Sequence, residues 1–238
     1  MTKKIKAEED GSDVEGVVVR GALLGPLLEL DDHECPPLPT PLPEYMSPPP
    51  NSLETICLEL DLPVGFYRLR RALLLNPTFL MEANFIDALS YTNVDWGPWD
   101  KHDGKIGSVE DIIDDIDKSN FVGARMKYQY LMPKSAFVKA NMAYEDVCLT
   151  SYNDHYFSLM RSITNPDVPY GKTFKTLSQI VIYNSGRNCS RMVCSAEAEF
   201  PNGPPMVARQ IKSAMRAGTT ESYVKLGEAI CKYADVYS

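Results

Sequence analysis

No stretch of this chain is long and apolar enough to cross a bilayer as a helix. Such a helix needs roughly 18–20 consecutive apolar residues, and the longest candidate, residues 17–30, contains Arg20, Glu29 and three glycine or proline residues. Three lysines precede this segment as in a secretory signal, but acidic residues intervene and no small-residue cleavage site follows. The sequence therefore favours a protein that is neither membrane-spanning nor secreted.

The common motifs of metal, phosphate and covalent chemistry are also missing. The three histidines lie far apart in the sequence, at no metal-ligand spacing. There is no glycine-rich phosphate loop and no Gly-x-Ser-x-Gly elbow, and the acidic run 110–117 lacks the glycine of a calcium loop. We therefore expect no metal, no cofactor and no catalytic residue. An enzyme remains an alternative, which would need convergent acid–base groups in a cavity.

Basic residues are outnumbered, and cysteines are few. The net charge is −8, which disfavours nucleic acid as a partner. The six cysteines are scattered without a CxxC pair, which is typical of reduced thiols rather than of a disulfide framework. We expect a cytoplasmic protein that is peripheral to membranes where it meets them.

Prolines are concentrated before residue 51. Residues 35–50 hold eight of the chain's 18 prolines, and such segments adopt extended conformations that do not pack. We expect residues 1–50 to form a disordered, charged and proline-rich tail, in which 36–50 is a linker or a site for a protein partner. Residues 51–238 are expected to form one domain, with an acidic insertion at 104–118.

The pattern after residue 50 alternates between strand-like and helical periods. Apolar residues recur with period two over 53–60, 88–96, 122–130, 136–144, 155–164, 174–184 and 189–200. Helical patterns cover 64–75, 78–85 and 206–237. Strands with one apolar face predict an antiparallel sheet with one face exposed to solvent. Strands followed by a segregated helix predict an α+β layer, which can leave a cavity between sheet and helix.

A turn with two prolines, an aspartate and a glycine separates the strands at 155–164 and 174–184. Its sequence is NPDVPYGKTF, residues 165–174. Each proline fixes its own φ and favours extended geometry in the residue before it. We expect Asp167 to cap the turn and Gly171 to supply a positive φ. The pattern predicts a rigid, shaped connection between two strands.

Several local strings together resemble one family. The string DVPYG at 167–171 with Phe174 is close to the signature of the VASt domain, the StART-like lipid-binding module of the Lam/Aster sterol transporters and their plant relatives. The WGPW turn at 96–99, the strand GARMKY at 123–128 and the final helix, with IK at 211–212 and ESY at 221–223, are similar to further family features. The resemblance covers residues 51–235.

The resemblance implies a helix-grip fold and a lipid ligand. In this fold a curved antiparallel sheet of about six to seven strands surrounds a long C-terminal helix, with two short helices after the first strand. The implied function is intracellular binding of a sterol or other apolar lipid, and its non-vesicular transfer at membrane contact sites, without enzymatic chemistry. A lipid-responsive interaction module without transfer activity is the alternative.

Candidate cavity residues follow from the inward phase of the strands and of the last helix. The cavity wall and lid are predicted to include Phe79, Met81, Phe85, Met126, Tyr128, Tyr130, Met142, Tyr144, Met160, Met192, Cys194, Ala196, Ile211 and Met215. Methionine suits such walls because its side chain adapts in shape. The same periodicity also fits a solid core. The lid is expected near residues 74–81.

The other residues that match the family are expected to have structural roles rather than to contact the ligand. The positions matching the family signature are Arg125, Asp167, Pro169, Tyr170, Gly171 and Phe174. Arg125 is expected to form an ion pair rather than to hold the ligand. Trp96 and Trp99 are expected to be buried anchors, with insertion of their turn into a membrane as the alternative.

Overall fold

The computed structural model describes residues 53–74, 79–101, 104–105, 122–135, 138–153, 155–186 and 189–237. The predicted tail 1–50, the acidic run 110–117 and the middle of the expected lid, residues 75–78, lie outside the described residues. The expectations for these segments stay predictions.

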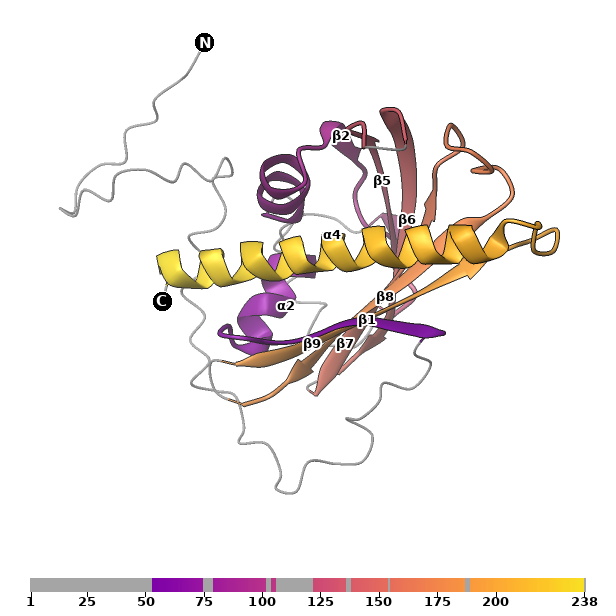
Figure 1. Cartoon of the computed structure of the whole chain (residues 1–238). Helices are drawn as coiled ribbons and strands as arrows, with labels where there is room; N and C mark the ends of the chain where they lie inside the picture. Colours follow the sequence, from indigo (N-terminus) through magenta and orange to yellow (C-terminus); the bar gives the residue numbers. More distant parts are fainter. Residues whose placement is uncertain are drawn as a thin grey trace, which may run out of the picture.

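One curved antiparallel sheet forms the body of the domain. Its strands are β1 (Thr55–Leu62), β2 (Thr92–Trp96), β3 (Asp100–Lys101), β4 (Gly104–Lys105), β5 (Arg125–Met132), β6 (Asn141–Tyr152), β7 (Tyr156–Thr164), β8 (Lys175–Asn184) and β9 (Ser190–Glu199). The strand order is β1-β9-β8-β7-β6-β5-β3-β4, and β2 also pairs with β5 (Figure 1). Among the described residues, seven strands have five residues or more. This confirms the predicted sheet.

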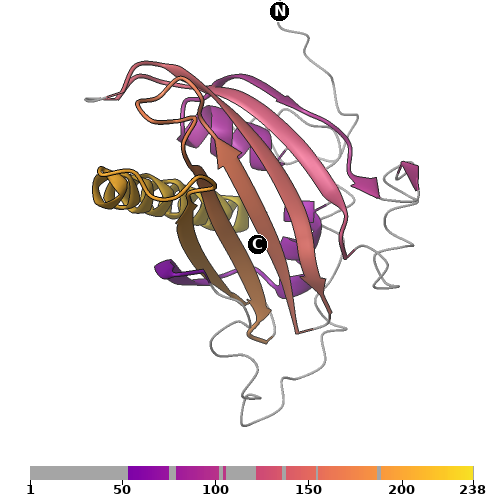
Figure 2. The same ribbon diagram turned by 90° about the vertical axis from the view of Figure 1, so that its right-hand side faces the viewer.

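In the described part of the chain, three helices cover the concave face of this sheet. They are α2 (Phe66–Leu74), η3 (Phe79–Ala88), which has π-type geometry, and α4 (Ala208–Tyr237). The 30-residue helix α4 lies in the hollow of the sheet, against β1 and β9, and contacts η3 (Figure 2). The order of strand, two short helices, strands and one long helix is the predicted helix-grip arrangement.

The register of the sheet decides which side chains face α4. Glu145 on β6 is paired with Tyr128 on β5 and with Ile163 on β7. Residues directly opposite each other share a face, so the rows of concave-face residues can be followed from strand to strand. This face and the helices form one buried cluster, which includes Tyr223, Leu226 and Ile230 of α4.

The predicted inward phase was wrong for the strand expected at 136–144. Strand β6 begins at Asn141 and pairs Ala143 with Tyr130, so Met142 and Tyr144 lie on the convex face, where Tyr144 is 45% exposed. A one-residue change of phase moves every side chain to the other face. The large apolar residues suggested the wrong phase, because the inward set contains small Ala143 and charged Glu145.

Met160 was also predicted to face inward, and this was wrong. It is paired with Cys148 on β6 and Gln179 on β8. Its neighbour in sequence, Arg161, is the residue that points toward α4, because alternate residues of a strand point to opposite faces. The apolar side chain of Met160 therefore lies on the convex face.

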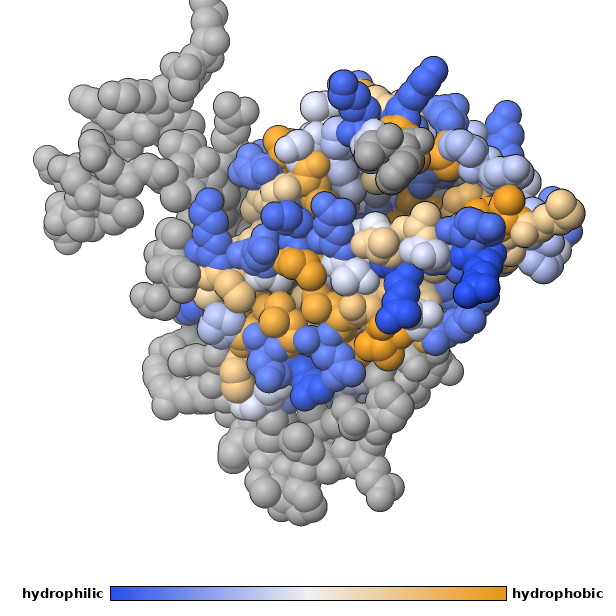
Figure 3. Space-filling model, viewed as in Figure 1, coloured by the Kyte–Doolittle hydropathy of each residue, from blue (hydrophilic) through white to orange (hydrophobic). Residues whose placement is uncertain are grey.

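Apolar side chains also reach the surface along one edge of the fold. In the view of Figure 3 they gather in the seam between α4 and the edge strand β1. Ile56 of β1 is 37% exposed, and Val224 of α4 is 38% exposed. The two elements approach closely at Gly227, where an added Cβ would lie 2.5 Å from Leu60 Cδ2 and would require this side chain to shift.

The turn at 165–174 has a different backbone geometry from the one predicted. The positive φ belongs to Tyr170, at 63°, and not to Gly171. Gly171 is required because an added Cβ would lie 1.8 Å from the carbonyl oxygen of Asn165. The Gly171 N–H donates to Val168 O at 2.9 Å, and the Asn165 amide donates to Asn141 Oδ1 at 3.1 Å. The second bond ties the turn to β6.

We predict that Gly171→Ala lowers the free energy of unfolding by about 2–4 kcal/mol, since the clash is with backbone and cannot relax by side-chain rotation. Urea denaturation at constant m-value measures this change. Gly218→Ala is the matched control: nothing lies within 4 Å of a Cβ there, so a helical alanine should raise stability by about 0.5–1 kcal/mol. Equal effects of the two variants would contradict the steric explanation.

Candidate functional site

A buried ion pair lies on the concave face of the sheet. Glu145 of β6 and Arg161 of β7 have side chains that are 0% and 7% exposed. Arg161 binds the carboxylate in bidentate fashion: Nε donates to Oε1, and Nη2 donates to Oε2 at 2.9 Å. Both charged groups are buried away from water, and each is stable there only because the opposite charge lies beside it.

Aromatic side chains surround this pair. The Tyr130 hydroxyl donates to Glu145 Oε2 at 3.0 Å, and the Tyr130 ring stacks on Tyr91 with centroids 4.7 Å apart. The Arg161 guanidinium carbon lies 5.8 Å from the centroid of Phe85 and 5.9 Å from that of Tyr223. Helix η3 supplies Phe85 and helix α4 supplies Tyr223, so sheet and helices meet at the ion pair.

Two buried hydroxyls, those of Ser178 and Tyr223, lie beside the pair. Ser178 of β8 is directly opposite Arg161. Its hydroxyl and that of Tyr223 have no hydrogen-bond partner of good geometry among the described residues. Buried polar atoms are nearly always hydrogen-bonded, and an unpaired one is destabilising. We call Tyr130, Glu145, Arg161, Ser178 and Tyr223 the polar cluster; it has capacity to bind one more polar group.

The two hydroxyls lie within reach of each other. Burial raises the pKa of Tyr223, and the Arg161 charge and a hydrogen bond with the Ser178 hydroxyl partly offset this rise. A single polar group placed between sheet and helix could therefore reach both hydroxyls at once.

The cluster is electrically balanced. Burial lowers the pKa of Arg161, but the Glu145 carboxylate outweighs this and holds that pKa well above its ordinary value. Burial raises the pKa of Tyr130 and Tyr223 far above the usual value for tyrosine, and that of Tyr91 to about 12. The arginine is therefore charged and the tyrosines are neutral at physiological pH. The cluster can offer hydrogen bonds to a neutral group rather than a free charge.

Apolar rows lie beside the cluster on the concave face. One row contains Leu159, Ile180 and Cys194, and the next contains Phe157, Ile182 and Met192. The C-terminal half of α4 lies over these rows, and its residues Tyr223, Leu226 and Ile230 are buried there. The inward stripe continues toward the N-terminus of α4 through Ile211 and Met215, which are only half-buried. The concave face is thus tightly packed at one end and looser at the other.

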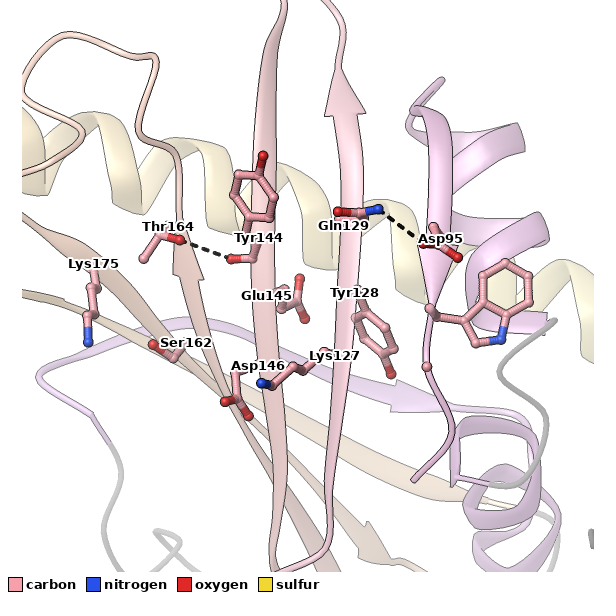
Figure 4. Close-up of a pocket in the computed structure, with 12 residues that line it drawn as sticks. Asp95, Lys127, Tyr128, Gln129, Tyr144, Glu145, Asp146, Ser162, Thr164 and Lys175 are labelled. Atoms are coloured by element: carbon pink, nitrogen blue, oxygen red, sulfur yellow. Dashed lines mark hydrogen bonds between the residues drawn. The ribbon is translucent and has the colours of Figure 1, made fainter. Parts of the chain in front are cut away.

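A hollow of about 520 Å³ opens on the opposite face of the sheet (Figure 4). In this view α4 passes behind the strands. Lys127, Tyr144, Asp146, Thr164 and Lys175 contribute to its lining. Charged and polar side chains of the convex face do not form a dry, apolar wall, so this hollow is not the cavity that the sequence suggested.

The sequence of this domain matches that of a known protein family. Residues 61–218 match the sequence profile of VASt, the VAD1 analog of StAR-related lipid transfer domain. The chain belongs to the VASt family. Its membership confirms the resemblance inferred from the sequence, and it assigns the domain a function of the lipid-binding or lipid-transfer type. No helix among the described residues has the length and apolar character to cross a membrane.

Solved structures resemble the VASt chain only distantly. The TTHA0849 protein of Thermus thermophilus is 12% identical, with a TM-score of 0.41, over 74% of this chain and 96% of that chain. A conserved protein of Geobacillus kaustophilus is 13% identical, with a TM-score of 0.41, over 73% of this chain and 93% of that chain. A search of the curated proteins finds no match.

Most of the predicted cavity residues of this VASt domain lie on the inner side. Those that belong to the concave face or to the helices over it are Phe85, Met126, Tyr128, Tyr130, Met192, Cys194, Ala196, Ile211 and Met215. Phe79 and Met81 belong to η3, and their side chains lie outside the description. Met142, Tyr144 and Met160 lie on the convex face. Contact of any of these residues with a ligand stays a prediction.

Sequence reasoning missed the polar cluster apart from Tyr130. Glu145 shares its phase with Ala143 and Val147, and Arg161 shares its phase with Leu159. A charged residue in the apolar phase of a strand is a signal of a buried polar site, and it was present in both strands. The inner face therefore carries a buried ion pair that the apolar periodicity did not indicate.

Arg125 and Trp99 have the structural roles expected of them, whereas Trp96, the other expected anchor, is only half-buried. Arg125 pairs with Asp146 at 3.1 Å on the surface. The indole N–H of buried Trp99 donates to Leu74 O at 2.8 Å, which makes Trp99 an anchor. Phe174, just after the signature turn, packs against Phe200 with ring centroids 6.3 Å apart. Asp167 and Pro169 are exposed, and the Asp167 side chain makes no hydrogen bond with the described residues, so the predicted cap is not seen.

We predict that Arg161→Met lowers the free energy of unfolding by about 3–5 kcal/mol, because it leaves the Glu145 carboxylate buried and unpaired. The double variant Glu145→Leu/Arg161→Met should lose less than this single variant, because no charge is stranded. Arg125→Ala breaks the exposed pair with Asp146 and serves as control, with an expected change of about 0–1 kcal/mol. Urea denaturation checks all three, and additive losses in the double variant would contradict the account.

Proposed function

We propose that this VASt domain binds a sterol or a similarly apolar lipid between the sheet and α4, and carries it between membranes without covalent chemistry. Membership of a lipid-transfer family supports the class of ligand. The proposal also rests on the concave face, where apolar rows adjoin one small polar cluster. Lipid sites are commonly built this way, with apolar walls and a few polar groups that fix orientation.

The polar cluster carries the proposal on ligand chemistry. The hydroxyls of Ser178 and Tyr223 are buried and make no hydrogen bond of good geometry with the described residues, although they lie within reach of each other, so they are the groups to which a ligand hydroxyl would bind. Arg161 is already matched by Glu145 in a bidentate pair, so an anionic headgroup or a fatty acid would face no free cation. A neutral lipid with one hydroxyl satisfies the site, and a sterol has this chemistry.

The proposed lipid transfer also has consequences for cofactors, location and partners. The domain needs no cofactor, works in the cytoplasm and touches membranes transiently, at contact sites of the endoplasmic reticulum if it belongs to a larger anchored protein. The proline-rich residues 36–50 are proposed as the site of any protein partner. A lipid-responsive module that binds without transfer is the rival, and it is separated by a vesicle-to-vesicle transfer assay.

Filling the inner face tests the proposal. Ala196 of β9 is buried on the concave face, opposite Ser178. We expect Ala196→Trp to reduce saturable binding of a fluorescent sterol at least about tenfold by occupying the ligand's volume, with near-native circular dichroism. Glu199→Trp is the matched control, because Glu199 is exposed on the same strand; it should bind as the wild type does.

Two results would count against the proposal. Unchanged sterol binding in correctly folded Ala196→Trp would remove this wall from the site. Absence of binding in the wild-type chain would contradict the sterol itself, and native mass spectrometry of co-purified lipid would then identify a different ligand or an empty protein. Binding without accelerated transfer would favour the rival module.

A further inference from the structure

Two turns lie together at the end of the sheet where α4 begins. The turn 165–174 connects β7 to β8, and the turn 200–207 connects β9 to α4. Lys175 and Glu199, the strand residues next to these turns, are directly opposite each other, and Phe174 contacts Phe200. Both turns project beyond the strands at the same end in Figures 1 and 2. We call residues 165–174 and 200–207 the tip.

The tip exposes two large apolar or amphipathic side chains. Met206 is fully exposed, at 101%, and Tyr170 is 54% exposed. They are the two most exposed large hydrophobic residues among the described ones. Pro169, Pro201 and Pro204 are exposed beside them and stiffen the two turns. The high exposure of both side chains at one projecting end marks the tip as a candidate interaction surface.

The backbone of Tyr170 is strained for the residue it carries. Its φ is 63°, a conformation that glycine or asparagine adopts more readily than an aromatic residue. The ring gains no core packing from this position, and the side chain makes no hydrogen bond, ion pair or ring contact with the described residues. Neither the backbone nor the core therefore explains the tyrosine, and local strain of this kind is often kept for function.

The tip adjoins the looser end of the concave face. Helix α4 starts immediately after the turn 200–207, and its first inward residues, Ile211 and Met215, are half-buried, whereas Tyr223 further along is fully buried. A lipid that leaves the space between sheet and α4 by this end would emerge beside Tyr170 and Met206. The surface that the tip touches is therefore the surface that would receive or supply the ligand.

We propose that the tip docks on a bilayer that contains anionic lipid, with Tyr170 at the headgroup level and Met206 inserted among the upper acyl chains. Tyrosine favours this interface because its ring is apolar and its hydroxyl is wet. Within residues 165–175 and 199–209 the cations Lys172, Lys175 and Arg209 outnumber the acids Asp167 and Glu199, in a chain of net charge −8. This local excess matches a negative surface. The role in transfer rests on the proposed function, but docking itself does not.

Sedimentation of the full chain with vesicles tests this inference. The vesicles contain phosphatidylcholine alone or with added phosphatidylserine, and the wild type should bind the second kind more strongly. Tyr170→Gly and Met206→Ser should each lower the bound fraction at least about threefold, by removing interfacial contacts. Tyr170→Gly should keep or raise the urea midpoint, because glycine accepts the positive φ. Loss of binding in a more stable protein separates docking from folding.

Matched control variants alter similarly exposed side chains away from the tip. Val122→Ser alters a residue 48% exposed just before β5, and Val224→Ser alters a residue 38% exposed on α4; both should bind vesicles as the wild type does. Equal losses in the controls, undiminished binding in both tip variants, or no vesicle binding by the wild type would overturn the inference. A chain that docks through the tip but takes up no sterol from cyclodextrin would support it and contradict the proposed function.

Discussion

The salt bridge between Glu145 and Arg161 is the constraint around which this VASt domain is organised. Two charges without water are stable only in mutual contact and with further hydrogen bonds, and here a bidentate pair and the Tyr130 hydroxyl supply them. The pair joins β6 to β7, and it lies against Phe85 of η3 and against Tyr223 of α4. The meeting point of sheet and helices is therefore defined by electrostatics as well as by apolar packing.

The same balance shapes what the inner face can recognise. Because Arg161 is neutralised within the protein, the hydrogen-bonding capacity that remains belongs to neutral hydroxyls, those of Ser178 and Tyr223. An apolar wall with a neutral polar centre selects a ligand that is mostly hydrocarbon and carries a small uncharged group. The half-buried start of α4, next to the tip, places the looser end of this face beside the most exposed apolar side chains among the described residues.

Much of this fold could be predicted from sequence periodicity, and the errors have physical causes. The strand Ser190–Glu199 and the helix Ala208–Tyr237 have clear periods and were predicted to within a few residues. Strand β6 was assigned the wrong face because its inward row mixes alanine, valine and a glutamate, while its outward row carries Met142 and Tyr144. The pairing of Glu145 with Arg161 depends on strand register, and no local pattern encodes that. Likewise, the 1.8 Å approach that requires Gly171 comes from the path of Asn165.

The central claim is that a neutral hydroxyl binds at the polar cluster, and the most direct measurement compares two ligands. The affinity of the full chain is measured for a sterol and for the same sterol with its hydroxyl converted to a methyl ether. If Tyr223 and Ser178 bind the hydroxyl, the free sterol should bind about tenfold more tightly, as the loss of a buried hydrogen bond implies, and this preference should shrink in Tyr223→Phe. Equal affinities of the wild type for both ligands would contradict the account.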